Sequence, residues 1–122
     1  MNRVVVRLGA VLAALAVAVG AFGAHGLSEA VPPEALDTFE TGARYHMYAA
    51  LALIGLGAAG LRTRTALILT AGAVIFAGSL YLLTLTGVSW LGAITPIGGV
   101  LMIVALLMSV FELRSPRTRA VG

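Results

Sequence analysis

The sequence contains no cysteine and no lysine, and it has few charged side chains of any kind. The lack of cysteine excludes disulfides, thiolate catalysis and cysteine-based zinc or iron–sulfur sites. Charged residues make up 11% of the 122 residues and hydrophobic residues 60%. A small soluble protein needs far more polar side chains to cover its surface, and disordered chains are poor in apolar residues. Lipid must therefore be the solvent for most of this surface.

Four apolar stretches are long enough to cross a bilayer, whose core of about 30 Å takes about 20 helical residues. They cover residues 4–24, 43–61, 65–86 and 91–113. Little of the chain remains outside them, so we expect one integral-membrane domain over residues 1–122. The predicted fold class is an all-α membrane protein, a bundle of four transmembrane helices.

The first stretch has some features of a secretory signal peptide. Arg3 and Arg7 form a basic start, and small residues close the stretch at 21–24. Its apolar run is longer than the usual core of about 7–15 residues in such peptides. We therefore expect residues 4–24 to be retained as a span.

The arginines predict the orientation of the chain. If the spans alternate in direction, seven arginines fall on one side: Arg3, Arg7, Arg62, Arg64, Arg114, Arg117 and Arg119. Cytoplasmic loops carry the excess of basic residues, so both termini are predicted to be cytoplasmic. Nucleic acid is not an expected partner, because basic binding surfaces are contiguous patches and these arginines are split among three flanks.

Residues 25–42 form the longest segment outside the predicted spans. Pro32 ends any preceding helix, and Pro33 suits the first position of a new one. Leu36 and Phe39 are apolar, while Glu34, Asp37, Glu40 and Thr41 are polar. This pattern predicts a short amphipathic helix in the outer interface, with Gly42 bending the chain before the second span.

Most polar side chains of the spans fall at their extracytoplasmic ends, where a polar pocket could hold a lipid head group or another anionic ligand. The candidate residues are His25, Glu40, Arg44, Tyr45, His46, Ser79, Tyr81 and Thr95. The same residues also have purely structural interpretations. Glu40 and Arg44 have the spacing of a helical ion pair, and His46 could be a neutral histidine bonded to a neighbouring helix. The aromatic residues could be ordinary interfacial anchors.

Catalytic and cofactor sites have no supporting pattern. His25 and His46 come from adjacent antiparallel spans, so a proton relay or axial haem ligation is conceivable, but no haem motif accompanies them. Neither a nucleophile elbow nor a phosphate-binding glycine loop occurs. We therefore expect no enzyme, no cofactor and no metal site.

Each predicted span carries small residues at which another helix can approach closely, as packing in lipid requires. They are Gly9, Ala13, Ala16, Gly20 and Ala24, then Ala52, Gly55 and Ala59, then Gly72 and Gly78, and finally Gly98 and Gly99. We expect these residues to pack the bundle together, with contacts between copies of the chain as the alternative.

Four motifs make a family resemblance specific. They read Gly-Ala-Phe-Gly-Ala-His-Gly-Leu (20–27), Thr-Gly-Ala-Arg-Tyr-His-Met-Tyr-Ala-Ala-Leu-Ala-Leu (41–53), Phe-Ala-Gly-Ser-Leu-Tyr-Leu-Leu-Thr-Leu-Thr-Gly (76–87) and Leu-Gly-Ala-Ile-Thr-Pro-Ile-Gly-Gly (91–99). The sequence resembles the domain of unknown function 423 family, which includes the bacterial YgdD-type proteins and, more distantly, the eukaryotic transmembrane protein 256 group. The resemblance implies a four-span protein of the bacterial inner membrane and carries no established activity.

By this resemblance the family's motif positions include His25, Tyr45, Ser79, Tyr81, Thr95, Pro96, Gly98 and Gly99. One departure stands out. Many members resemble Tyr-Gln-x-x-His-Ala-Leu where this chain has Tyr45-His46-Met47-Tyr48-Ala49-Ala50-Leu51. The histidine expected at 49 is Ala49 here, and 46 carries a histidine instead of the usual glutamine.

The leading functional hypothesis is a non-enzymatic accessory, scaffold or lipid-associated membrane protein. Its expected partners are membrane lipid and either a second copy of the chain or another membrane protein. The alternative is a subunit of an oligomeric transporter or channel for a small solute or protons. A membrane enzyme acting on lipid comes third.

Overall fold

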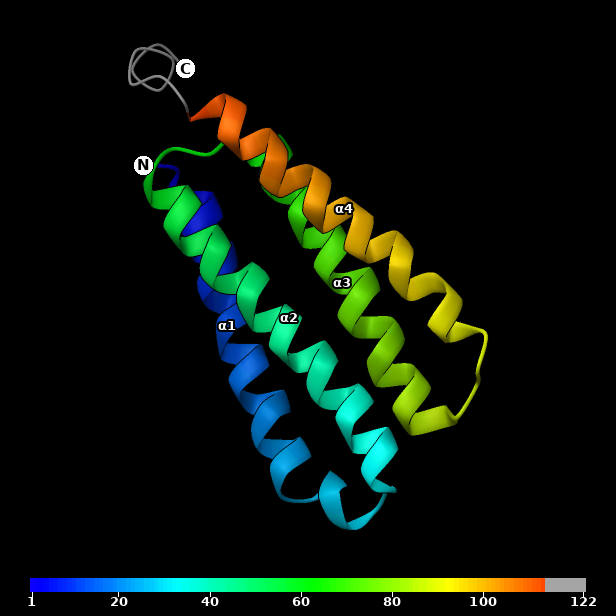
Figure 1. Ribbon diagram of the computed structural model, residues 1–122. Coiled ribbons are helices and arrows are strands. Elements are labelled where there is room, and N and C mark those ends of the chain that lie inside the picture. Colours follow the sequence, from blue (N-terminus) through cyan, green and yellow to red (C-terminus); the bar gives the residue numbers. More distant parts are fainter. Residues whose placement is uncertain (114–122) are drawn as a thin grey trace.

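The computed structural model describes residues 1–113 and consists of helices joined by short loops (Figure 1). The elements are α1 (Arg3–Ala24), the short 3-10 helix η1 (Leu27–Glu29), α2 (Pro33–Ala58), α3 (Thr63–Thr86) and α4 (Leu91–Glu112). The predicted all-helical fold is confirmed. The tail arginines Arg114, Arg117 and Arg119 lie outside the described residues.

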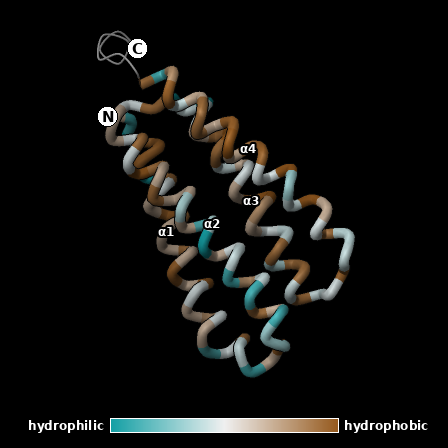
Figure 2. Tube along the Cα trace, viewed as in Figure 1, coloured by the Kyte–Doolittle hydropathy of each residue, from teal (hydrophilic) through white to brown (hydrophobic). Residues whose placement is uncertain are grey.

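Three helices of the described chain are long and apolar enough to cross a membrane: α1 together with η1, α3 and α4. The helix α2 has the length, but Glu34, Asp37, Glu40 and Arg44 in its first half lower its mean hydropathy. Figure 2 shows this difference, with hydrophilic colour recurring along α2 and hydrophobic colour dominating α4. A crossing by α2, and with it the count of four spans, stays a prediction.

The segment before the second predicted span is not a separate amphipathic helix. Pro33 stands at the first position of α2, and one continuous helix runs from there to Ala58. Gly42 lies inside this continuous helix, where its bare backbone makes room for α3. A β-carbon at Gly42 would lie 3.0 Å from the Tyr81 ring and 3.3 Å from Leu80 Cβ.

The long helices form two antiparallel hairpins, α1–α2 and α3–α4, which meet along α2 and α3. A glycine lets the backbones touch in each hairpin. A β-carbon on Gly9 would lie 2.8 Å from Ala50 O, and one on Gly98 would lie 2.4 Å from Phe76 N. Distances this short leave no space for any side chain, which is how helices in lipid gain close packing.

The four helices follow one another across the molecule, with α1 and α4 at opposite edges (Figure 1). The expected bundle is therefore open rather than closed around a common axis. Its core lies where the two hairpins meet and includes Val5, Ala49, Leu53, Leu69 and Met102. An open row is stable in a bilayer because lipid can cover the outer apolar faces, which water could not do.

Side chains tie the ends of the helices together at the end where α1 begins and α4 finishes. Asn2 accepts a hydrogen bond from the Val5 backbone and donates to Leu61 O at 2.8 Å and Thr63 Oγ1 at 3.0 Å. Glu112 accepts hydrogen bonds from the Arg62 N–H and the Thr65 hydroxyl. These contacts satisfy polar groups at the start of α3 that the helix itself leaves unpaired.

Candidate functional site

The buried His46 and the partly buried Tyr81 form a polar pair between α2 and α3. The imidazole Nδ1 lies 2.9 Å from the Tyr81 hydroxyl, and His46 is only 9% exposed. The other ring nitrogen, Nε2, is buried without a hydrogen-bond partner. The interpretation of His46 as a histidine bonded to a neighbouring helix therefore matches the structure.

Ser79 and Thr95 form a second polar pair, between α3 and α4. Their hydroxyl oxygens lie 2.6 Å apart, and Ser79 also donates to Phe76 O at 2.9 Å. Both hydroxyls are therefore used in holding the α3–α4 hairpin together. Interhelical hydrogen bonds of this kind contribute about 0.6 kcal/mol on average in a bilayer.

The remaining candidate residues lie apart from these pairs. His25 ends α1 as its exposed C-terminal cap, and Arg44 and Tyr45 are exposed on α2. Glu40 and Arg44 share a face of α2, but within residues 1–113 no ion pair joins their side chains. The structure thus divides the predicted polar cluster into two partly buried pairs and several groups that are exposed or partly exposed.

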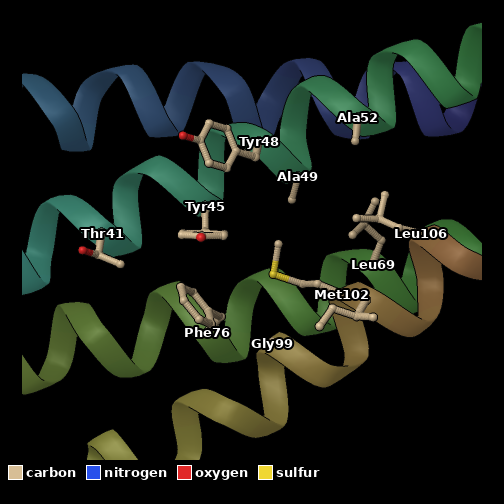
Figure 3. A pocket seen from close by; sticks show the side chains of 11 residues that line it. Thr41, Tyr45, Tyr48, Ala49, Ala52, Leu69, Phe76, Gly99, Met102 and Leu106 are labelled. Atoms are coloured by element: carbon tan, nitrogen blue, oxygen red, sulfur yellow. The ribbon is translucent and has the colours of Figure 1, made fainter.

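A groove runs between α2 and α4 with α3 as its floor, and we call it the α2–α4 groove (Figure 3). Its volume is about 440 Å³. It is lined by Thr41, Tyr45, Tyr48, Ala49, Ala52, Leu69, Phe76, Gly99, Met102, Ile103 and Leu106. The groove exists because α4 packs on α3 and leaves the facing side of α2 uncovered.

The α2–α4 groove has one aromatic end and one aliphatic end. The Tyr45 ring lies 4.9 Å from the Phe76 ring and 5.2 Å from the Tyr48 ring, measured between centroids. Figure 3 shows these rings at one end and Leu69 and Leu106 at the other, with Met102 pointing across toward α2. The hydroxyls of Thr41, Tyr45 and Tyr48 supply the polar groups, all at the aromatic end.

A smaller groove of about 200 Å³ lies on the opposite side of the α2–α3 pair. Leu12 and Leu15 of α1 line it together with residues of α3, and His46 and Tyr81 form part of its wall. The polar atoms of that pair are engaged with each other or buried. Neither groove is lined by His25, Glu40 or Arg44.

Of the predicted site residues, only Tyr45 lines the larger groove. Nothing in the sequence assigns a role to Phe76, Met102 or Leu106, because apolar residues of a span carry no signal for a groove. On α2 a signal exists, since Thr41, Tyr45, Tyr48 and Ala52 recur at helical spacing on one face. Along that face the residues change from polar and aromatic to small, in the same direction as the groove runs from its aromatic end to its aliphatic end.

Long apolar helices, two hairpins packed through glycine and polar groups paired between helices are typical of a helical membrane protein. Within residues 1–113 no group of three metal-ligating side chains gathers, and the larger groove is mostly apolar. The chain belongs to the family described as protein of unknown function DUF423, whose model matches residues 19–99.

Two relatives show how far the similarity extends. The UPF0382 membrane protein YwdK of Bacillus subtilis is 46% identical over 115 residues, which cover 88% of this chain and 94% of the relative. The UPF0382 membrane protein SSP2132 of Staphylococcus saprophyticus is 44% identical over 113 residues, covering 88% and 94%. No solved structure matches the chain.

Proposed function

We propose that this protein is a non-catalytic membrane protein that holds a membrane lipid in the α2–α4 groove, as a lipid-associated scaffold. The observation that carries the proposal is the groove itself, about 440 Å³ of mostly apolar space along one face of the open helix row. In a bilayer, acyl chains are the molecules that surround such a face. The groove therefore offers a chain a fixed position against Met102 and Leu106.

The ends of the groove support a defined orientation of that lipid. Hydroxyls of Thr41, Tyr45 and Tyr48 lie at one end, and aliphatic side chains line the other. Tyrosine prefers the level at which head groups meet acyl chains, because its ring is apolar and its hydroxyl is polar. The lipid head group then lies near the start of α2 and its tail near Leu69.

We propose the membrane topology on the same basis. The protein crosses a bacterial inner membrane four times, α2 included, with both termini in the cytoplasm. The start of α1 and the end of α4 both bond to the connection between α2 and α3 and so lie at one end of the molecule, which supports this arrangement (Figure 1). The head-group end of the groove then faces the outer leaflet.

The transporter alternative has less support. A path for protons or a solute needs polar groups across the whole membrane thickness, at the protein interior. In the described residues, the polar pairs that join neighbouring helices along their length are His46–Tyr81 and Ser79–Thr95. The hydrogen bond of each pair joins two neighbouring helices and is not part of a continuous polar path.

Filling the groove tests the proposed function. Ala52→Phe places a ring in the α2–α4 groove, and we expect it to lower lipid retention about ten-fold, the result of losing about 1.4 kcal/mol of binding. Native mass spectrometry of the full chain, released from mild detergent with a defined phospholipid mixture, measures retained lipid directly.

The matched control is Leu51→Phe, at a neighbouring position that is 55% exposed and outside the groove. This control should retain lipid as the unaltered chain does. Equal lipid retention by both variants, or no retained lipid in the unaltered protein, would reject the proposal.

A further inference from the structure

One ridge of α2 beside the α2–α4 groove carries both charged side chains and side chains with hydroxyl groups. Asp37, Thr41, Arg44 and Tyr48 are spaced at four, three and four residues, which places them on one side of the helix. Thr41 and Tyr48 line the groove, so Asp37 and Arg44 flank it at its head-group end. Glu40 lies one turn before Arg44, on the adjoining side of the helix.

The charges on this ridge are open to solvent or head groups. Asp37 and Arg44 are exposed and Glu40 is partly exposed. The Thr41 hydroxyl donates to the Asp37 backbone carbonyl at 2.9 Å and leaves the Asp37 carboxylate free of that bond. Within the described chain no ion pair neutralises Arg44, so its guanidinium is available to an anion.

The order of these groups along α2 matches the order of the groups in a phospholipid. Starting from the apolar groove, the helix presents tyrosine hydroxyls, then a cation at Arg44, then carboxylates at Glu40 and Asp37. One helical turn, about 6 Å for four residues, separates Arg44 from Glu40. A phosphate and a primary amine joined by a two-carbon linker match a cation and a carboxylate at that separation.

We infer that the α2–α4 groove and its ridge select a zwitterionic aminophospholipid, one with a phosphodiester and a primary ammonium head. This inference rests on the proposed lipid-binding function and specifies its ligand. The acyl chain lies against the apolar groove wall seen in Figure 3, and the Arg44 guanidinium donates to the phosphate. Glu40 and Asp37 accept hydrogen bonds from the ammonium.

The charge pattern favours this class over two neighbouring ones. A lipid with a phosphate and no amine, such as phosphatidylglycerol, brings a single negative charge near two carboxylates. A lipid with a quaternary amine, such as phosphatidylcholine, has the same net charge but no N–H donor for those carboxylates. A primary amine satisfies both requirements, charge and hydrogen bonding.

Competition among lipids with identical acyl chains tests the inference. The full chain is equilibrated in mild detergent with equal amounts of phosphatidylethanolamine, phosphatidylglycerol and phosphatidylcholine, and retained lipid is identified by native mass spectrometry. We expect phosphatidylethanolamine to be enriched about two- to five-fold over each competitor, as suits charge pairs at an exposed site.

Two variants test separately the recognition of the ammonium and the recognition of the phosphate. The double variant Asp37→Asn and Glu40→Gln should abolish the preference among the lipids while total retention remains. Arg44→Gln should lower retention of all three lipids about two- to five-fold, because all three carry the phosphate. Glu29→Gln removes the same charge from η1, off this ridge, and should leave both quantities unchanged.

The outcomes distinguish the inference from the function on which it rests. Equal retention of the three lipids, or enrichment of phosphatidylglycerol or phosphatidylcholine, overturns the aminophospholipid inference and leaves lipid binding intact. A preference that survives loss of both carboxylates overturns it as well. Absence of any retained lipid overturns both proposals together.

Discussion

At the scale of single residues, position in the helix decides what a glycine does in this protein. A β-carbon on Gly98 would collide with the backbone of Phe76 at 2.4 Å, whereas one on Gly78 would meet nothing within 4 Å. Both residues are glycines inside transmembrane-type helices, and both stood out as small residues in the sequence. Only the packing of the helices makes Gly98 a backbone contact and leaves open space beside Gly78, which lines the smaller groove.

This difference predicts opposite effects of one substitution. Gly98→Ala should destabilise the protein by about 1–3 kcal/mol, because the added methyl forces α3 and α4 apart. Gly78→Ala should be neutral or stabilising by up to about 1 kcal/mol, since alanine favours helix over glycine. Denaturation in detergent measures both, and equal destabilisation would contradict the packing described for Gly98.

His46 illustrates the same point for a polar residue. Its sequence position left a ligand-binding role and a helix-to-helix hydrogen bond both open. The Tyr81 hydroxyl at 2.9 Å shows the hydrogen bond, which a sequence cannot reveal because the two residues are 35 positions apart. The smaller groove beside the pair keeps a binding role for His46 a prediction.

At the scale of elements, the beginning of α3 depends on the end of α4. The first turn of a helix has N–H groups without intrahelical partners, and Glu112 accepts from the Arg62 N–H while also pairing with the Thr65 hydroxyl. A carboxylate is favourable at that position because of the helix dipole. Thr65 is buried, so its hydroxyl depends on this partner.

Removing the carboxylate should loosen this junction. Glu112→Ala is expected to cost about 0.5–2 kcal/mol, the range for losing a helix cap. Hydrogen exchange should then increase in the first turn of α3, while Arg64→Ala, an exposed change in the same turn, should leave exchange there unaltered. Unchanged exchange in Glu112→Ala would show that the cap is dispensable.

The helix α2 also shows how an element differs from its sequence pattern. A proline pair, acidic residues and a glycine suggested a short interfacial helix followed by a bend. The hydrogen-bonded helix continues through Gly42, and the glycine makes room for Tyr81. Glycine signals both bends and close packing, and local sequence does not distinguish them.

At the scale of the whole molecule, one experiment tests both whether α2 crosses the membrane and which way the chain is oriented in it. The sequence has no cysteine, so single cysteines can be placed without background labelling. We expect Ser28→Cys, in the loop after α1, to react with a membrane-impermeant maleimide in intact cells. Arg64→Cys, after α2, should react only when the membrane is broken.

Labelling of the two sites contradicts parts of the proposed topology in different ways. Equal reactivity of both cysteines in intact cells would place them on one side and remove α2 as a span. Labelling of Arg64→Cys but not Ser28→Cys would reverse the orientation. Both residues are exposed in the folded chain, so accessibility within the protein does not limit the reaction.

The open row of helices also belongs to this scale. In water, α1 and α4 would need partners on more than one face, because the hydrophobic effect opposes exposed apolar surface. Large apolar side chains of α4 such as Ile103, Leu107 and Phe111 are more than half exposed here. In lipid an exposed apolar surface carries no such cost, so the face of α2 that α4 leaves uncovered can remain open as a groove.

The sequence by itself determined the helical membrane character, the approximate ends of α1, α3 and α4, and the family. These depend on composition, on runs of apolar residues and on contiguous motifs, all of which are local properties of the chain. The tertiary structure alone decided which glycines touch, which polar residues pair and where the α2–α4 groove lies. Those features join residues distant in sequence, and in lipid the apolar pattern does not specify which face of a helix meets its neighbour.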